Sequence, residues 1–344
     1  MGYKRLDPDD FVVSAQSITA TCWTGNVVNL TTFFTSSNQV SSISGKYYTN
    51  IFNADSGSAN RESQFQIAYG NKNGGGALAY NNAAAAGVST TSTIYGQYRS
   101  LVLEDETADF IFGNFTGSSI YVISVERARY KESLLPGSLN LTVGKASKTL
   151  QLTDNSKDVT LPTYYGTQRA YQIVSGSNGN AYAGNGYSYS GSYGLFFPDT
   201  ATIILNGAAL DDNSSAGSTG TNDGEGINLS TNTTTNTNGN NNQKMFNAIV
   251  SGSNFSLNSE ETITSDFVFV RARNSEFNYS ENPSYISGST GEVIYNYFIN
   301  NPQTYMTTVG LYNDSNDLLA VAKLSKPLNK DFTKEALIRV KLDF

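Results

Sequence analysis

The stretch IYVISV, residues 120–125, is apolar at almost every position and combines β-branched with aromatic side chains. A run of this kind predicts a central strand that is covered on both faces. In QFQIAY, residues 64–69, polar and apolar side chains alternate, which predicts a strand with one buried face. These two runs indicate a protein built mainly from strands.

Short runs of the same character recur along the chain, separated by clusters of Gly, Ser and Asn. Residues 93–103 have a helical period instead, with Ile94, Tyr98, Leu101 and Val102 on one side. We therefore predict a mainly β fold of antiparallel, sandwich-like sheets with one or two short helices and long loops. The other predicted strands lie at residues 11–19, 27–35, 47–52, 109–112, 202–205, 248–250, 267–271, 292–298, 305–312, 318–324 and 337–342, with two or three more between 139 and 159.

The composition changes near Leu161, because Arg169 is the only basic residue between positions 164 and 243. We predict two β-rich domains, residues 1–160, which contain the helix near 93–103, and residues 161–344. Residues 211–243 consist mostly of Asp, Ser, Gly, Thr and Asn and offer little to bury. They predict an exposed low-complexity loop in the second domain.

The 344 residues include no histidine and only one cysteine. A Ser-His-Asp triad, a Cys-His pair and a histidine base are therefore excluded, and a zinc site would lack its usual ligands. Cys22 stands beside Trp23 in an apolar stretch, which favours a buried core thiol over a reactive one.

Carboxylate pairs are the catalytic arrangement that this composition leaves open. Adjacent residues of a strand point to opposite faces, whereas a glycosidase holds two carboxyl groups across its substrate. We therefore expect solvated surface acids and no enzyme. Asp211, Asp212, Asp223 and Glu225 could gather around calcium, but their order differs from the twelve-residue calcium loop, and we predict no metal and no cofactor. The adjacent acids stand at residues 9–10, 104–106, 211–212 and 260–261.

The net charge of −7 and the lack of a Lys/Arg-rich patch indicate that nucleic acid is not a partner. The apolar runs are shorter than the roughly 20 residues of a membrane span, so we expect no membrane segment, and the polar start of the chain predicts no signal peptide.

The densest charge cluster is ERARYKE, residues 126–132, directly after the predicted central strand. It is either a solvated strand end or a contact with another protein. In the second case Arg127, Arg129, Tyr130 and Lys131 are the candidate interface residues, because Arg is enriched at interfaces.

A second candidate interface lies near the C-terminus. GLYNDSNDLL, residues 310–319, predicts a hairpin because two apolar runs are joined by Asn and Asp. Residues 323–344 are the most basic part of the chain. We take Leu311, Tyr312, Lys323 and Phe344 as candidate interface residues of this C-terminal sheet.

The segments YMTTVGLYND (305–314) and DLLAVAKLSKP (317–327) resemble virion proteins of contractile-tailed phages. Their pattern is similar to the β-rich segment of phage tail-collar fibre proteins. Other stretches resemble structural proteins of T-even-like phages, especially those of marine cyanobacteria. These stretches are residues 14–19 with 30–35, 94–99, and 120–123 with 127–131.

The resemblance implies a structural subunit of a tailed-phage particle, in the tail or baseplate, that acts by protein–protein assembly. Its partners would be other virion proteins and copies of itself, and its location the virion, after assembly in the bacterial cytoplasm. Two alternatives stay open. One is a receptor- or carbohydrate-binding adhesin of the tail, with the Tyr-rich residues 182–193 and the loop 211–243 at an outer tip and a host-surface glycan as partner. The other is a neck or capsid-surface protein.

Overall fold

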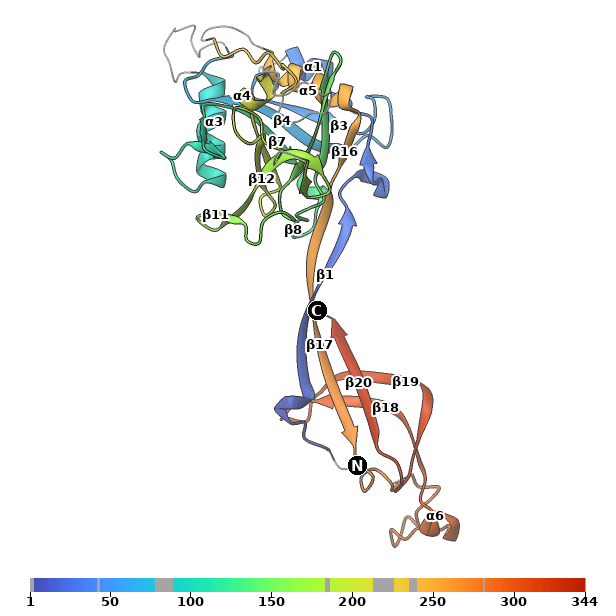
Figure 1. Ribbon diagram of the computed structural model, residues 1–344. Helices are drawn as coiled ribbons and strands as arrows, with labels where there is room; N and C mark the ends of the chain where they lie inside the picture. The colour runs from blue at the N-terminus through green and yellow to red at the C-terminus, as the bar shows by residue number, and fades with distance from the viewer. Residues whose placement is uncertain are drawn as a thin grey trace. The chain divides into compact units, whose positions relative to one another are not determined.

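The computed structural model describes residues 3–41, 44–77, 89–182, 186–212, 226–234, 240–280 and 282–343. Strands make up 44% and helices 17% of the structure, and the paired strands are antiparallel, with one large curled sheet. The predicted mainly β, sandwich-like fold class is therefore confirmed (Figure 1), although helical segments are more numerous than the one or two that we predicted.

The chain divides into two compact units at places that its composition does not mark. Unit 1 consists of Met1–Ser17 and Thr262–Phe344, and unit 2 of Ile18–Glu261. The predicted boundary between residues 160 and 161 falls inside unit 2, where Leu152 pairs with Ser175 within one sheet. The two-domain division at that point is wrong, because strand pairing joins segments whose compositions differ.

Unit 2 contains a sheet with the strand order β2-β16-β9-β10-β12-β14-β15-β7-β4-β3, and β11 and β13 pair with β12. In chain order these strands are β2 (Asn29–Leu30), β3 (Tyr48–Phe52), β4 (Ser63–Asn71), β7 (Ser119–Val125), β9 (Asn140–Lys145), β10 (Lys148–Asp154), β11 (Thr163–Tyr165), β12 (Gln168–Ser177), β13 (Asn180–Ala181), β14 (Gly194–Phe197), β15 (Thr202–Asn206) and β16 (Asn254–Ser256).

The remaining elements of unit 2 cover or flank this sheet. They are η2 (Thr24–Asn26), α1 (Ser37–Ser41), α2 (Ser44–Tyr47), α3 (Thr90–Val102), the β5 (Phe110–Phe112) and β6 (Phe115–Gly117) hairpin, η4 (Arg127–Arg129), β8 (Ser133–Leu134), α4 (Gly207–Asp211) and α5 (Asn241–Gly252).

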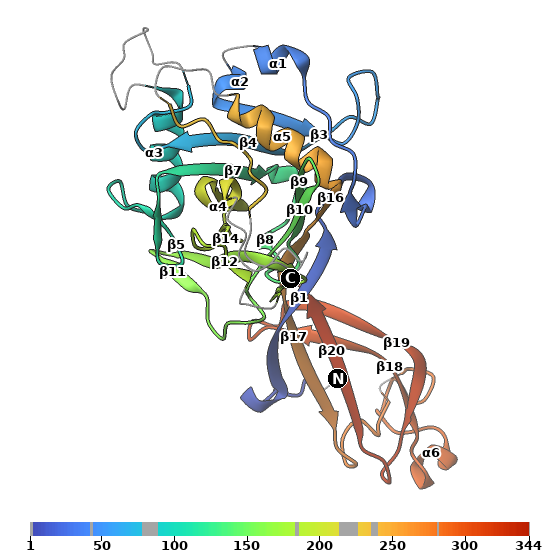
Figure 2. The ribbon, with the colours of Figure 1, turned by 45° about the horizontal axis from the view of Figure 1, so that its top comes forward.

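Strand β7 is covered on both faces, as its sequence predicts. Tyr121 and Ile123 belong to the core cluster that includes side chains of α5, whereas Ile120 and Val122 belong to the cluster that includes side chains of α3. Helices α3 and α5 therefore lie on opposite faces of the sheet (Figure 2). The predicted helix near 93–103 is confirmed as α3, whose first turn is capped by Ser89.

Some short apolar runs take a different structure from the predicted one. Residues 248–250 lie in α5, because Met245, Ala248 and Ile249 share one buried helical face among Asn-rich neighbours. The predicted strand at 292–298 overlaps α6 (Asn296–Asn300), and the one at 27–35 is reduced to β2. A run of three or four apolar residues fits either period, so packing decides.

The low-complexity segment is only partly exposed where the structure describes it. Ile227 and Leu229 are buried in the core of unit 2. The backbone around them is bonded by side chains of other elements, since Lys145 Nζ donates to the Asn228 and Leu229 carbonyls at 2.6 and 3.1 Å. The prediction for 211–243 is therefore wrong for Ile227 and Leu229 and for residues 241–243, which begin α5, whereas Asn228, Ser230, Thr233 and Thr234 are exposed residues of a loop. Residues 213–225 and 235–239 lie outside the described residues.

Unit 1 is built from long strands. Strand β17 (Asn258–Ala272) pairs with β20 (Ala336–Asp343) from Ser265↔Asp343 to Ala272↔Ala336. Strand β18 (Thr304–Tyr312) pairs with β19 (Leu318–Lys330), which confirms the predicted hairpin. Unit 1 also contains η1 (Pro8–Asp10), the first residues of β1 (Phe11–Thr21) and α6.

Candidate interaction surface

Strand β17 lies between β1 and β20 in a four-stranded sheet, in which it also pairs with β8. The part formed by β17 and β20 buries one face and exposes the other. Val268 and Val340 pair across the two strands and are buried. Leu337 points to the opposite face, three positions away in β20, and is more than half exposed. On that face Arg339 lies over the ring of Phe267, with its guanidinium carbon 5.3 Å from the ring centre.

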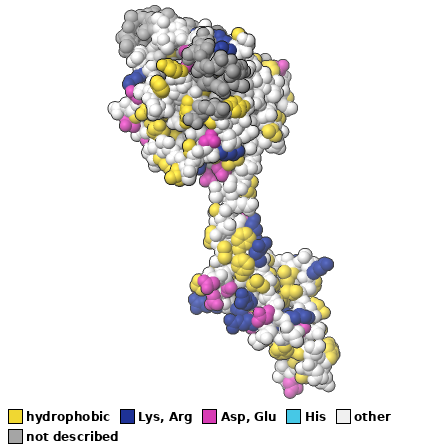
Figure 3. Space-filling view, viewed as in Figure 1, with side chains coloured by type: hydrophobic (Ala, Val, Ile, Leu, Met, Phe, Trp, Pro, Cys, Tyr) yellow, Lys and Arg dark blue, Asp and Glu magenta, His cyan; other side chains and the backbone are white. Residues whose placement is uncertain are grey.

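Apolar side chains also line the other strands of unit 1. Phe11, Val12 and Val13 begin β1 and are all exposed, with Val13 at 69%. On β19, Leu319 is 68% exposed and Val321 is 60% exposed. We call the following exposed residues of unit 1 the unit-1 apolar surface: Phe11, Val12, Val13, Leu319, Val321 and Leu337. Figure 3 shows hydrophobic side chains in yellow on one face of the molecule.

Unit 1 exposes more large hydrophobic side chains than it buries, and the unit-1 apolar surface is part of this excess. Among its described residues, unit 1 has eighteen exposed large hydrophobic side chains and five buried hydrophobic residues. Unit 2 has fifteen exposed and forty-seven buried. Single exposed apolar residues are normal, but a compact unit that exposes most of its apolar side chains indicates an interaction surface.

The predicted interface residues of the C-terminal sheet lie together in the β18–β19 hairpin. Leu311 pairs with Ala320 and is half-buried, while Tyr312 and Lys323 are exposed. The ring of Tyr312 covers Gly310 and meets the ring of Tyr3 edge-on at 5.0 Å. Phe344 lies outside the described residues.

The predicted charge cluster at 126–132 lies in unit 2, and its most buried cation is bonded within the chain. Arg129 forms an ion pair with Glu62 at 2.9 Å and donates to the Thr24 hydroxyl. Arg127 lies over the ring of Tyr130, 4.6 Å from its centre, and donates to the Tyr130 carbonyl. Arg129 and Tyr130 therefore make contacts within their own chain, which stabilise unit 2.

Lys131 and the exposed guanidinium of Arg127 are the remaining cations of this cluster. The backbone N–H of Lys131 donates to the Ser259 hydroxyl at 2.8 Å, while its side chain is exposed. An interface at this place would therefore use Arg127 and Lys131, and the other predicted residues would act by supporting them.

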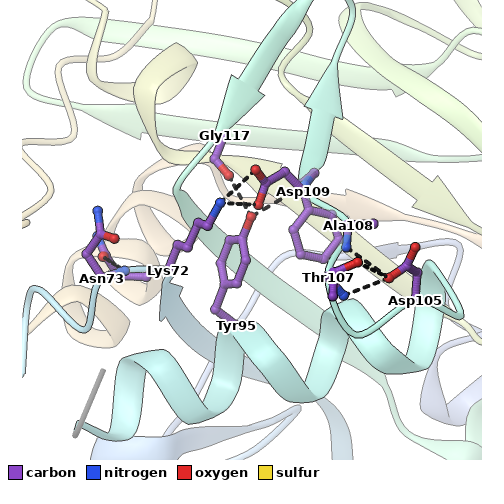
Figure 4. Close-up of polar contacts among 10 residues, drawn as sticks. Lys72, Asn73, Tyr95, Asp105, Thr107, Ala108, Asp109 and Gly117 are labelled. Carbon is purple, nitrogen blue, oxygen red and sulfur yellow. Dashed lines mark hydrogen bonds and ion pairs between the residues drawn. The ribbon is translucent and has the colours of Figure 1, made fainter. Parts of the chain in front are cut away.

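Two of the acids at 104–106, Glu104 and Asp105, accept hydrogen bonds from backbone groups of the same unit. Glu104 accepts from the Thr167 backbone N–H. Asp105 accepts from the backbone N–H groups of Thr107 and Ala108 (Figure 4). Bonds from Thr167 lower the pKa of Glu104, and bonds from Thr107 lower the pKa of Asp105. A general acid of a glycosidase needs the opposite shift.

A buried tyrosine next to this turn joins α3 to the β5–β6 hairpin. The Tyr95 hydroxyl donates to the Gly117 carbonyl at 2.9 Å and accepts from the Phe110 N–H, and Lys72 forms an ion pair with Asp109 beside it (Figure 4). Burial raises the pKa of Tyr95, so the phenol stays protonated near neutral pH. These hydrogen bonds hold the β5–β6 hairpin against α3.

Of the four acidic residues considered as calcium ligands, the structure describes Asp211 and Asp212. Asp211 accepts from the Thr231 N–H and hydroxyl, and burial raises its pKa. Asp223 and Glu225 lie outside the described residues. In the part of the chain that the structure describes, no three acidic or Cys side chains gather as metal ligands would.

Two exposed aromatic side chains lie on neighbouring turns of unit 2. Tyr189 is 79% exposed at the tip of a turn in which Ser188 and Gly191 exchange two backbone hydrogen bonds. Phe115, at the start of β6, is half exposed, and a Cβ on Gly191 would lie 3.0 Å from its ring. The Tyr-rich region thus presents Tyr189 on a turn restrained by two backbone hydrogen bonds, next to the β5–β6 hairpin that carries Phe115, an arrangement that spacing along the sequence does not reveal.

Comparisons with protein-family models, with curated proteins and with solved structures found no match to this chain. No helix among the described residues has the length and hydropathy of a membrane span.

Proposed function

We propose that the chain is a structural subunit of a tailed-phage particle, in the tail or baseplate, and that it acts by protein–protein assembly rather than by catalysis. The observation that carries the proposal is the unit-1 apolar surface. A soluble protein that works alone gains nothing from so many exposed apolar side chains, whereas a subunit buries them against its neighbours.

Strand edges support the same proposal. The β18–β19 hairpin is a sheet of only two strands, so each strand has one edge without a strand partner in the described chain. An open edge is an aggregation hazard in a free protein and a docking element in a particle. The resemblance of residues 305–327 to virion proteins falls on this same hairpin.

Antibody labelling of virions tests the proposal directly. An antibody raised against the purified chain should decorate the tail or baseplate of the phage that encodes it, as seen by electron microscopy. Label on the neck or the capsid surface would favour the neck or capsid-surface alternative. A protein absent from purified virions would contradict a structural role.

The adhesin is the second candidate function, and the Tyr189 turn favours it. Tyrosine rings supply binding area at low cost in conformational entropy, and the double hydrogen bond between Ser188 and Gly191 restrains this turn. If the chain binds host-surface glycans here, Tyr189→Ala should remove binding to host cells. Tyr164→Ala, at another exposed tyrosine of unit 2, is the matched control and should leave binding unchanged.

A further inference from the structure

A pocket with a volume of about 380 Å³ lies in unit 2, at a place that includes neither the unit-1 apolar surface nor the Tyr189 turn. Its volume is within the range of roughly 300–1,000 Å³ that is usual for small-molecule sites. The residues that line it come from five stretches that are far apart in the sequence: Val28; residues 135–138 with Asn140; Lys157; Asn178; and Ser256 with Asn258. Tertiary packing therefore builds this pocket, and no local pattern predicts it.

The buried side chain of Asn140 joins three of these stretches. Its amide nitrogen donates to the Asn178 side-chain oxygen at 2.9 Å and to the Ser256 hydroxyl at 3.2 Å, and its oxygen accepts from the Asn178 backbone N–H at 2.7 Å. The Asn258 backbone N–H donates to the Ser138 hydroxyl at 3.0 Å. The walls of the pocket are therefore fixed within the chain, and a ligand does not have to order them.

Lys157 is the one charged residue among those that line the pocket. Its side chain packs against two glycines, because a Cβ on Gly179 would lie 3.0 Å from Lys157 Cγ and a Cβ on Gly137 would lie 3.2 Å from Lys157 Cε. The buried Asp154 carboxylate, which does not line the pocket, accepts from the Gly137 N–H with both oxygens and holds this turn. The stem of Lys157 therefore lies against a fixed main-chain surface, which limits the positions of its ammonium.

Three hydrogen-bond donors of this lining have no acceptor within the described chain. No ion pair or hydrogen bond of the described residues uses the Lys157 ammonium. The Asn178 side-chain oxygen accepts from Asn140, but its amide nitrogen has no partner among the described residues. The Ser256 hydroxyl accepts from Asn140 and keeps its own hydrogen available. A cation beside N–H and O–H donors binds an oxygen anion, such as a carboxylate or a phosphate, by charge-assisted hydrogen bonds.

The rest of the lining indicates a ligand that is larger than a bare anion. A carboxylate or phosphate group alone would leave most of the 380 Å³ unfilled. Val28, Leu135 and Pro136 offer apolar surface, and Asn258 offers a neutral amide. A sugar ring fits such a lining, because its C–H groups pack on apolar side chains and its hydroxyl groups bond with amides and hydroxyls.

We infer that this pocket binds a sugar unit that carries an anionic group, with Lys157, Asn178 and Ser256 around the anionic group and the apolar side chains against the ring. A uronic acid and a sugar phosphate share this chemistry. The inference goes beyond the proposed structural role and does not depend on it, because the pocket uses no residue of unit 1.

Calorimetric titration of the full chain with small sugars and small anions tests the site. Glucuronate or glucose 6-phosphate should bind at least about tenfold more tightly than glucose, because the Lys157 ammonium attracts only the charged sugars. The charged sugar that binds more tightly shows whether the pocket takes a carboxylate or a phosphate. Acetate and inorganic phosphate should bind at least about tenfold more weakly than the sugar with the same anionic group. Equal binding of glucose and both charged sugars, a bare anion that binds as tightly as its sugar, or no binding at all would overturn the inference.

Lys157→Ala locates the cation. The variant should bind the charged sugar at least about tenfold more weakly and lose the preference over glucose. Lys46→Ala, at an exposed lysine of unit 2 that does not line the pocket, is the matched control and should leave binding unchanged. Equal weakening by both variants would show that only the net charge of the chain matters, and would overturn the assignment of Lys157.

Asn178→Asp tests the neighbouring donor. The new carboxylate keeps an acceptor oxygen for Asn140, but it replaces the free N–H groups by a negative charge that repels the ligand. Binding of the charged sugar should therefore fall by at least as much as in Lys157→Ala. Unchanged binding would mean that the anionic group lies elsewhere and would overturn the inference. Protection of the Cys22 thiol in each variant shows that unit 2 is folded.

Tyr189→Ala separates this pocket from the glycan site considered at the Tyr189 turn. Sugar binding that Tyr189→Ala removes and Lys157→Ala leaves intact would overturn the pocket and favour the turn. Binding of the charged sugar through Lys157 by a chain that is absent from virions would support the pocket and contradict the structural role.

Discussion

A Cβ atom on Gly75 would lie 1.9 Å from the carbonyl oxygen of Thr233, so the two backbones are closer than any side chain at position 75 permits. This contact brings residues 226–234 against the loop that follows β4, where the Gly76 N–H donates to the Thr234 carbonyl at 2.8 Å. A segment composed mainly of Ser, Thr and Asn is thereby ordered by main-chain contacts.

Gly75→Ala should therefore destabilise unit 2 by about 1–3 kcal/mol, because the new methyl group forces the two backbones apart. Urea unfolding measures the change. The matched control is Gly96→Ala within α3, where an added Cβ meets nothing within 4 Å. It should stabilise the protein by up to about 1 kcal/mol, since alanine favours a helix interior. Equal stability of the two variants would contradict the close contact.

Tyr95→Phe should destabilise unit 2 by about 1–3 kcal/mol, because it leaves the Gly117 carbonyl and the Phe110 N–H without their buried partner. Thermal or urea unfolding gives the value. Tyr164→Phe, at an exposed ring of the same unit, should stay within about 0.5 kcal/mol of the unmodified protein. A neutral Tyr95→Phe variant would show that water replaces the hydroxyl.

Cys22 should be inert in the folded protein and reactive only after unfolding. It is buried, and burial raises the pKa of the thiol to about 12. At pH 8 the thiolate fraction is then about 10⁻⁴, against about one quarter for an ordinary cysteine. Because it is the single cysteine, the rate of thiol labelling with and without urea reports the opening of unit 2. Complete labelling within seconds in native buffer would refute the buried position.

Asp154 should make unit 2 less stable as the pH rises. Its carboxylate is buried, accepts from the backbone N–H groups of Gly137 and Ser156, and has a pKa that burial raises above its usual value. A group whose folded-state pKa is raised contributes its stability below the unfolded-state pKa, about 3.9, and loses it as the pH rises through the folded-state pKa.

Asp154→Asn removes the buried charge but keeps an acceptor oxygen for the N–H groups. The variant should therefore lose less stability than the unmodified protein between pH 4 and pH 8, compared by urea unfolding at both values. A pH dependence identical in the two proteins would show that Asp154 does not contribute to it.

Several local features of the fold could be predicted because neighbouring residues determine them. The apolar run at 120–125 forms β7 with both faces covered, the 310–319 segment forms a hairpin, and the period at 93–103 forms α3. The burial of Cys22 followed from its apolar neighbours in the same way. In each case a continuous apolar run, a repeat of 3.6 residues or a turn signal acts over a few residues.

Long-range packing decided the rest. Strand pairing across residues 160 and 161 placed parts of both compositional halves in unit 2, and the two ends of the chain met in unit 1. Arg129, a candidate interface residue, pairs with Glu62, which is distant in sequence.

The amino-acid sequence by itself determined a mainly β protein without histidine chemistry, because composition and side-chain alternation act locally. Only the tertiary structure decided that Ile227 and Leu229 are packed into a core and that unit 1 leaves Val13, Leu319 and Val321 uncovered. Burial depends on which segments meet in space, and a pattern of apolar residues is the same whether the surface that covers it belongs to its own chain or to a neighbouring one.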